Sequence, residues 1–362
     1  MIKKSKKVLL GMSGGVDSCV SAVLLKKQGF DVRGVYLWMW KVDGKKSNTK
    51  AIEDAQKIAK ILDIPLEIID VQKKFKKEVV GYFLKEYSAG RTPNPCIFCN
   101  ENLKFKTLFE VADKLGIDYV ATGHYALARK VKSQKSKVKL EEKFQYKLLE
   151  AKDKNKDQSY FLYRLKQKQL ARIIFPLGEY QKEEVKTLAK KFKLPVFDKA
   201  ESQDICFLAN ISVEEFLAEN IKLKKGKIVN TDGKVIGEHL GLPLYTLGQR
   251  KGINIGGTGP YYVAKRDAKR NCLTVTNKKE DLFLFSKFAN INEVNWISTA
   301  PKLPVKVLAR IRYRSSLIPA TIVMRRKKYE IQFDIAQRAV TAGQSVVFYN
   351  KKEEVVGGGV VF

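Results

Sequence analysis

The sequence predicts an α/β protein in which a doubly wound parallel sheet is followed by two small β-rich domains, the last of them barrel-like. Short apolar runs alternate with amphipathic helical segments over the first two hundred residues. Beyond Asn210, short alternating strands and turn dipeptides replace that pattern. Strand–helix alternation implies parallel strands, because each helix must carry the chain back across the sheet. At 362 residues, the chain is long enough for two or three cores.

The elements of the first region follow from apolar periodicity. The expected strands are Val8–Gly11, Val32–Trp40, Leu66–Val71 and Tyr119–Tyr125. The expected helices are Val16–Lys27, Thr49–Asp63, Phe75–Tyr87 and Asn100–Leu115, with two more near Ser159–Leu170 and Gln181–Phe192. Gly29 and Pro65 follow the first two helices and end them. The Lys-rich segment Arg129–Lys147 interrupts the series and is expected to form an exposed hairpin.

Turn signals divide the remaining chain into hairpins. The expected β segments are Lys227–Val235 around Thr231-Asp232-Gly233, Tyr261–Lys265 with Leu273–Thr276, and the later strands Val305–Ile311, Ala320–Met324 and Tyr329–Phe333. The expected domains are 1–210, 211–278 and 279–362, and the last resembles a small antiparallel barrel.

Composition excludes several classes of protein. Hydrophobic residues make up 44% and charged residues 30%, which is ordinary for a globular chain. No apolar run approaches the ~18–20 residues of a membrane span. The opening MIKKSKK leads directly into VLLGMSGG, so no secretory signal is expected and the protein is predicted to be cytoplasmic. The 69 Lys and Arg against 38 Asp and Glu give a net charge of +31, spread along the chain. That excess is compatible with polyanion binding or with a Lys-rich solvated surface.

The segment from Ser13 to Ser18 is the strongest local signal. Its two adjacent glycines allow backbone N–H groups to converge on one point between a strand and a helix, and the helix N-terminus adds partial positive charge. The alternative is a purely structural turn. The segment lacks the Gly-Lys-Ser/Thr ending of a Walker A loop. It is similar to the pyrophosphate loop of enzymes that split ATP into AMP and pyrophosphate, in which Asp17 would help to hold Mg²⁺.

Cysteines provide the second signal. The chain has five cysteines and two histidines, too few for a disulfide scaffold and for most zinc constellations. Cys96 and Cys99 follow two prolines, and Cys99 is expected at a helix start, where the dipole lowers the pKa of a thiol. A zinc site formed by Cys96, Cys99, Cys206 and His124 is an alternative, as is an iron–sulfur cluster, but no metal is expected.

Cys206 lies between Ile205 and Phe207. Alone, it is more typical of a buried packing residue. Together with Cys99 it is a candidate partner thiol.

Eight motifs, in order from residue 11 to 359, carry a resemblance that covers essentially the whole chain. They are SGGVDS, GRTPNPCxxCNxxxKF, ATGHYA, NKDQSYFLY, SQDICF, YTLGQRKG, RYRS and GQSVVFY…GGG. With them the sequence resembles the bacterial tRNA-specific 2-thiouridylases (MnmA/TrmU family), of the pyrophosphate-loop ATPase superfamily. The resemblance implies that the first domain has the Rossmann-like fold of the adenine nucleotide alpha hydrolases.

The resemblance also implies roles for individual residues. Cys99 matches the catalytic nucleophile and Cys206 the cysteine that carries a persulfide. ATP, with Mg²⁺, would be bound by Gly11, Met12, Ser13, Gly14, Gly15, Val16, Asp17 and Ser18, and its adenosine by Leu37 and Gly123. Asn94, Pro95 and Cys96 match the segment that faces the target base. Further tRNA contacts match His124, Lys156, Asp157, Gln158, Arg312, Tyr313 and Gln344.

Three positions depart from the family pattern. Cys96 stands where some members have Asp, Leu37 where some have Met, and Cys19 where Ser is common.

The implied reaction is ATP-dependent 2-thiolation of the wobble uridine in a subset of tRNAs. Its implied partners are tRNA and a persulfide donor such as a cysteine desulfurase or a sulfur-relay protein. Either free sulfide or the persulfide itself attacks the adenylated base, and both routes end in a Cys99–Cys206 disulfide. Two other functions stay open: another pyrophosphate-loop synthetase or amidotransferase, and an RNA-binding protein with a vestigial nucleotide site.

Overall fold

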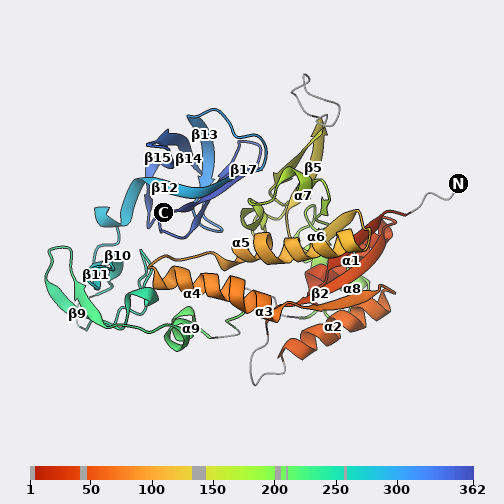
Figure 1. Ribbon diagram of the computed structural model, residues 1–362, viewed down its shortest axis with the longest axis horizontal. Helices are drawn as coiled ribbons and strands as arrows, with labels where there is room; N and C mark the ends of the chain where they lie inside the picture. The colour runs from red at the N-terminus through yellow and green to blue at the C-terminus, as the bar shows by residue number, and fades with distance from the viewer. Residues whose placement is uncertain (1–4, 41–46, 133–143, 200–204, 209–210, 257–258) are drawn as a thin grey trace.

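The amino-terminal sheet is parallel and has the strand order β3-β2-β1-β4-β7. The computed structural model describes residues 5–40, 47–132, 144–199, 205–208, 211–256 and 259–362 (Figure 1). The five strands are β1 (Lys7–Gly11), β2 (Asp31–Trp38), β3 (Leu66–Asp70), β4 (Tyr119–Thr122) and β7 (Ile173–Ile174). Strands β2 and β3 lie on one side of β1, and the chain then returns to place β4 and β7 on the other side. The carboxyl ends of β1 and β4 therefore form the switch point at which such sheets bind ligands.

Helices cover both faces of this sheet. On one face lie α1 (Val16–Lys27), α2 (Ser47–Ile61) and α8 (Lys182–Lys191), and on the other α4 (Gly81–Ser88), α6 (Phe105–Lys114) and α9 (Val213–Asn220). Successive residues of β1 alternate between the two cores: Val8 and Leu10 pack toward α1, and Leu9 packs toward α6. The predicted doubly wound α/β domain is confirmed.

Two of the expected helices begin earlier than predicted, and each contains a π-helical turn. One runs through α3 (Gln72–Phe75), the π turn η1 (Lys76–Val80) and α4, and the other through α5 (Pro95–Cys99), the π turn η2 (Asn100–Lys104) and α6. The prediction of one helix at Ser159–Leu170 is wrong. A 3₁₀ turn (η4, Ser159–Leu162) and α7 (Gln167–Leu170) are separated there by residues 163–166, of which Lys166 has an extended backbone at φ −105° and ψ 162°.

Six strands of the last domain close into a barrel in the order β12-β15-β14-β13-β16-β17, with β12 also paired to β17. They are β12 (Phe285–Trp296), β13 (Val305–Arg310), β14 (Ile318–Arg325), β15 (Lys328–Arg338), β16 (Ser345–Tyr349) and β17 (Glu354–Val361). A hairpin from the first region, β5 (Leu127–Lys132) and β6 (Phe144–Leu149), extends this sheet through β6 and β17. The predicted hairpin is confirmed in its strands, and its turn lies outside the described residues.

A four-stranded sheet with the order β10-β11-β8-β9 lies between these two regions in sequence. Its strands are β8 (Gly226–Val229), β9 (Val235–His239), β10 (Tyr262–Asp267) and β11 (Cys272–Thr276). Both predicted hairpins are present, and Ile228, Val263 and Leu273 form their core. In Figure 1 this sheet and the N-terminus lie at opposite ends of the long axis. None of the helices within the described ranges is long and apolar enough to cross a membrane.

Candidate active site

Two adjoining cavities lie at the switch point of the parallel sheet. The smaller, of about 260 Å³, is bordered by the ends of β1, β2 and β4, and we call it the cradle cavity. The larger, of about 750 Å³, reaches from the start of α1 to α5 and the barrel, and we call it the thiol cavity. The two share the lining residues Ser13, Asp17, Met39, Lys104, His124 and Gln158. A molecule held in one cavity would therefore meet the contents of the other.

The Gly-rich segment forms the expected curl at the start of α1. Ser18 Oγ accepts a hydrogen bond from Ser13 N at 3.2 Å and donates one to Gly15 O at 3.0 Å. Gly14 has φ +70°, and a Cβ there would lie 2.4 Å from Ala51 O, so no other residue fits. The residues of the curl and of the helix start line the cavities, and the N-terminus of a helix favours an anion.

Nine of the ten residues predicted to bind ATP border one of the two cavities. The cradle cavity is lined by Gly11, Met12, Ser13, Asp17, Ser18, Leu37 and Gly123, and the thiol cavity by Gly15 and Val16. Gly14 lies behind them, against α2.

The Asp17 carboxylate is held by two groups that sequence reasoning missed. Asp17 Oδ1 accepts hydrogen bonds from Lys182 Nζ at 2.7 Å and from the Tyr125 hydroxyl at 2.9 Å. Lys182 is buried and belongs to α8, 165 residues away in the chain. No local pattern marks such a partner. Both residues line the thiol cavity.

The thiol cavity brings together Cys96, Cys99 and Cys206. Cys99 is buried, and Cys96 and Cys206 are exposed to the cavity. The interpretation of Cys206 as a packing residue is wrong, because its neighbour Phe207 fills that role. The Phe207 ring packs among aromatic side chains that include Phe83, at a centroid distance of 5.2 Å.

The predicted low pKa of the Cys99 thiol is wrong. The helix starts at Pro95, so Cys99 is the last residue of α5 instead of the first residue of a helix. The helix dipole therefore stabilises its thiolate little. Burial raises the pKa of Cys99 to about 11, against the opposing influence of Lys104. Loss of water inside the cavity likewise raises the pKa of Cys206 to about 12 and that of Cys96 above its ordinary value. The free thiols are therefore mostly protonated at neutral pH.

His124 is neutral in this site. Burial and the nearby Lys104 hold the pKa of its imidazole well below the usual range. Its Nδ1 is hydrogen-bonded to Thr122 Oγ1 at 2.8 Å, and its ring stacks on Phe105. The imidazole is thereby oriented between the two cavities.

Six of the ten residues predicted to contact tRNA line the thiol cavity: Pro95, Cys96, His124, Lys156, Gln158 and Tyr313. The other four side chains make internal bonds. Asn94 caps α5, and the buried Asp157 accepts from Ala151 N and Ser159 Oγ at 2.9 and 2.7 Å. Arg312 donates to Ala339 O at 2.6 Å, and Gln344 donates to Thr92 O at 2.9 Å. Arg314, which the sequence analysis missed, lines the cavity beside Tyr313.

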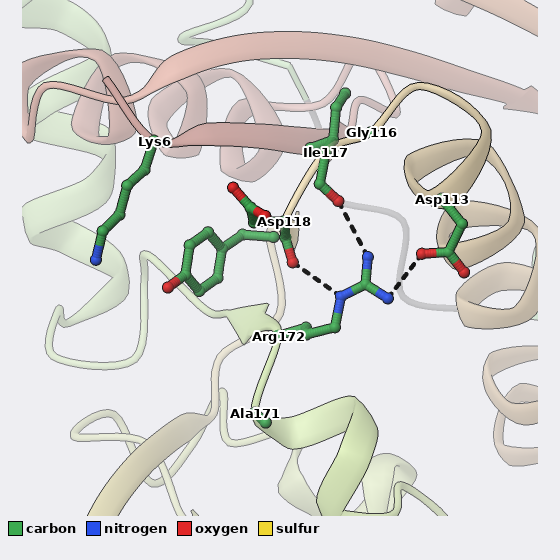
Figure 2. A pocket seen from close by; sticks show the side chains of 8 residues that line it. Lys6, Asp113, Gly116, Ile117, Asp118, Ala171 and Arg172 are labelled. Carbon is green, nitrogen blue, oxygen red and sulfur yellow. Dashed lines mark hydrogen bonds and ion pairs between the residues drawn. The ribbon is translucent and has the colours of Figure 1, made fainter. Parts of the chain in front are cut away.

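A third cavity, of about 520 Å³, lies at the opposite end of the sheet (Figure 2). Its main polar side chain, Arg172, is held by Asp113 and by the carbonyls of Ile117 and Asp118. Lys6 and Tyr119 place this cavity at the amino ends of β1 and β4. Ligands of parallel α/β sheets bind at the carboxyl ends, so this cavity is not the candidate site. Within the described residues, no cluster of three or more His, Cys, Asp or Glu could hold a metal ion, and the zinc alternative has no support there.

The parallel sheet and the cradle at its switch point define a nucleotide-binding α/β domain. The family described as tRNA methyl transferase HUP domain matches residues 6–210. The PRC-barrel domain of the tRNA methyl transferases matches residues 214–277, and an aminomethyltransferase beta-barrel domain matches 286–361.

Full-length relatives identify the particular family. The chain is 41% identical over 359 residues to the tRNA-specific 2-thiouridylase MnmA 2 of Clostridium botulinum, with 98% of both chains covered. It is 41% identical over 365 residues to MnmA of Nitrosomonas eutropha, again with 98% of both covered. It is 43% identical over 372 residues to MnmA 2 of a Thermoanaerobacter species, with 99% of this chain and 98% of the relative covered. The protein belongs to the tRNA-specific 2-thiouridylase family.

Proposed function

We propose that this protein is an ATP-dependent sulfurtransferase that replaces the 2-carbonyl oxygen of the wobble uridine in tRNA with sulfur. One observation carries the proposal: an anion cradle and a cavity containing Cys99 and Cys206 share a wall. Activation by a nucleotide and delivery of sulfur can therefore occur on one base. The full-length relatives support the same activity.

ATP is proposed to bind with its phosphates at the cradle and its adenosine toward Leu37 and Gly123. A Cβ at Gly123 would lie 3.0 Å from Ser18 N, so a larger residue would press on the cradle. Asp17 is the carboxylate of the cradle. Mg²⁺ entering with ATP would be held by Asp17 and the phosphates, the usual donor set for this ion, and would offset phosphate charge.

Adenylation makes the uridine oxygen a good leaving group. Attack of the oxygen on the α-phosphate of ATP releases pyrophosphate, and the oxygen later departs within AMP. In one route, the Cys99 thiolate attacks the Cys206 sulfur, the persulfide S–S bond breaks, and hydrosulfide adds to C2. In the other, the terminal persulfide sulfur attacks C2 and expels AMP, and Cys99 then attacks the Cys206 sulfur to free the thiolated base. Both routes form a Cys99–Cys206 disulfide, which an external thiol must reduce.

The tRNA is proposed to bind across the thiol cavity, between α5 and the barrel. Lys156 and Arg314 supply positive charge at the cavity, and Tyr313 and Phe161 supply aromatic faces on which a base can stack. Cys206 is exposed to the cavity, as loading by an external persulfide donor requires. A cytoplasmic location follows from tRNA as the substrate.

The test is thiolation of unmodified tRNA by the purified protein with ATP and a persulfide donor, with 2-thiouridine measured by mass spectrometry. Cys206→Ser is expected to bind ATP and tRNA but to form no 2-thiouridine. Cys272→Ser, in the middle sheet, is the matched control and is expected to be active. Retained sulfur incorporation in Cys206→Ser contradicts the proposal.

The two alternative functions give different results in the same assay. A binding protein with a vestigial nucleotide site releases no pyrophosphate when tRNA and ATP are mixed. An amidotransferase or synthetase releases pyrophosphate but needs ammonia instead of persulfide.

A further inference from the structure

Lys104 is placed where the two cavities meet. It is the last residue of the π turn η2 and belongs to the wall that the cradle cavity and the thiol cavity share. A π turn inserts one extra residue into a helix and re-aims the side chains around it, and such turns are frequent at functional sites. Here the turn directly follows Cys99, so one short segment supplies a thiol and a cation to the same space.

Two other lysines at the thiol cavity are engaged with carboxylates. Lys182 Nζ lies 2.7 Å from Asp17, and Lys199 Nζ lies 2.7 Å from Asp54. Among the residues that the structure describes, no hydrogen bond or ion pair is made by the Lys104 ammonium. Lys104 is half-buried and lines both cavities, so its ammonium is available to an anion that enters either of them.

The positive charge of Lys104 acts on every cysteine of the site. It opposes the rise in pKa that burial causes at Cys96, Cys99 and Cys206, and a hydrogen bond with the Lys104 backbone adds to this effect at Cys99. Other charged or titratable groups also face the cavity: His124, Tyr125, Lys156, Tyr313 and Arg314, besides the two lysine–carboxylate pairs. None of those cations contributes to the pKa of Cys99 as Lys104 does.

Sulfur transfer moves negative charge across this wall. Before the step, the charge lies on a sulfur anion in the thiol cavity. The sulfur then bonds to C2 of the uridine, the C2–O bond breaks, and the electron pair leaves with the oxygen as part of AMP in the cradle cavity. A fixed cation between the two positions stabilises the charge throughout the step without reorganising.

We propose that Lys104 is a catalytic residue of this reaction, whose ammonium contacts the attacking sulfur anion on one side and the departing AMP on the other. This inference rests on the proposed function and assigns Lys104 to its second half-reaction, after adenylation. The same cation serves either route, because both the hydrosulfide and the persulfide attack from the thiol cavity.

The test compares Lys104→Met and Lys104→Arg with Lys106→Met, a matched control in which an exposed lysine of the adjoining helix is changed. Single-turnover thiolation at saturating ATP and tRNA is expected to slow about 100-fold in Lys104→Met, the usual cost of removing one group that stabilises transition-state charge. Lys104→Arg should restore most of the rate, and Lys106→Met should match the wild type. A Lys104→Met rate within threefold of the wild type, or equal losses in Lys104→Met and Lys104→Arg, overturns the proposal.

A second measurement does not depend on thiolation. The rate of Cys99 alkylation by iodoacetamide between pH 7 and 10, followed by peptide mass spectrometry, reports the thiolate fraction. Lys104→Met should lower that rate roughly three- to tenfold at each pH, and Lys106→Met should leave it unchanged. An unchanged profile in Lys104→Met overturns the assignment. If the profile shifts but the wild type forms no 2-thiouridine, the proposed function fails and the effect of Lys104 on the thiol stands.

Discussion

Gly343 joins the barrel to the segment that carries the cysteines, and Gly343→Ala is expected to break that contact. The residue has φ +91°, and a Cβ there would lie 2.8 Å from both the N and the O of Thr92. The flanking bonds show how tightly the two chain segments meet: Thr92 N donates to Ala342 O at 2.8 Å, and Gln344 Nε2 donates to Thr92 O at 2.9 Å. The atoms in the way belong to the backbone, so no rotamer change relieves the clash.

The expected destabilisation has two parts. Positive φ costs an alanine ~1–2 kcal/mol, and the overpacked contact adds about 1–3 kcal/mol. Gly233→Ala is the matched control, because Gly233 has φ +84° but no atom lies within 4 Å of the position that its Cβ would take. Gly233→Ala is therefore expected to show only the destabilisation caused by positive φ.

Calorimetry of the full-length variants measures the difference, and single-turnover thiolation measures its effect on the site. Gly343→Ala should unfold at a clearly lower temperature than Gly233→Ala and should thiolate more slowly, since Thr92 leads into Pro95 and α5. Equal unfolding temperatures for the two variants would refute the reasoning, because they would show that only backbone conformation matters at Gly343.

Three further predictions concern the pH response, the cradle and the charge. Burial raises the pKa of the Asp157 carboxyl to about 6. The contribution of this carboxyl to the free energy of unfolding is therefore complete below about pH 4 and is lost as the pH rises through 6. In calorimetry, the stability of Asp157→Asn relative to the wild type should increase as the pH is raised from 4.5 to 7. A difference between the two proteins that stays constant over this range contradicts the prediction. Gly14→Ala, with its Cβ 2.4 Å from Ala51 O, should weaken ATP binding at least about tenfold in titration calorimetry. Gly29→Ala, at φ +82° with open space, should bind normally. The tRNA association constant should fall as salt is added, and a plot of its logarithm against the logarithm of the salt concentration should have a slope of about −0.7 to −0.9 for each phosphate contact. Arg314→Gln should remove about one such contact. A flat salt dependence contradicts a basic RNA-binding surface.

Features that depend on neighbouring residues could be predicted from the sequence. The cradle is one, because two glycines between a strand and a helix determine the curl by themselves. The hairpin strands around Thr231-Asp232-Gly233 are another, and so are β1, β2, β3 and β4 of the parallel sheet, whereas the two-residue edge strand β7 was not predicted. Their signals lie within ten residues of the structure they specify, so no tertiary contact is needed to recognise them.

Features that depend on contacts between distant parts of the chain could not be predicted from the sequence. The partner of Asp17 is 165 residues away, and nothing in the segment around Lys182 distinguishes it from the many other lysines of the chain. The pKa of Cys99 depends on burial by segments distant in the sequence, and on a helix that starts five residues before the predicted start at Asn100. The internal bond of Arg312 could not be predicted either, because its guanidinium donates to Ala339 O, 27 residues further along the chain.

The pairing of β6 with β17 has a consequence for how the chain is made. Leu148 of β6 lies opposite Val355, so a strand synthesised early meets this neighbour only after β17, more than 200 residues later, has been synthesised. Until then β6 has an open edge, a site at which β strands associate with other chains. Truncation before β17 would leave that edge exposed permanently. Strand β17 thus completes the sheet of the β5–β6 hairpin as well as its own barrel, and a nascent chain is vulnerable to aggregation at β6 until β17 has been made.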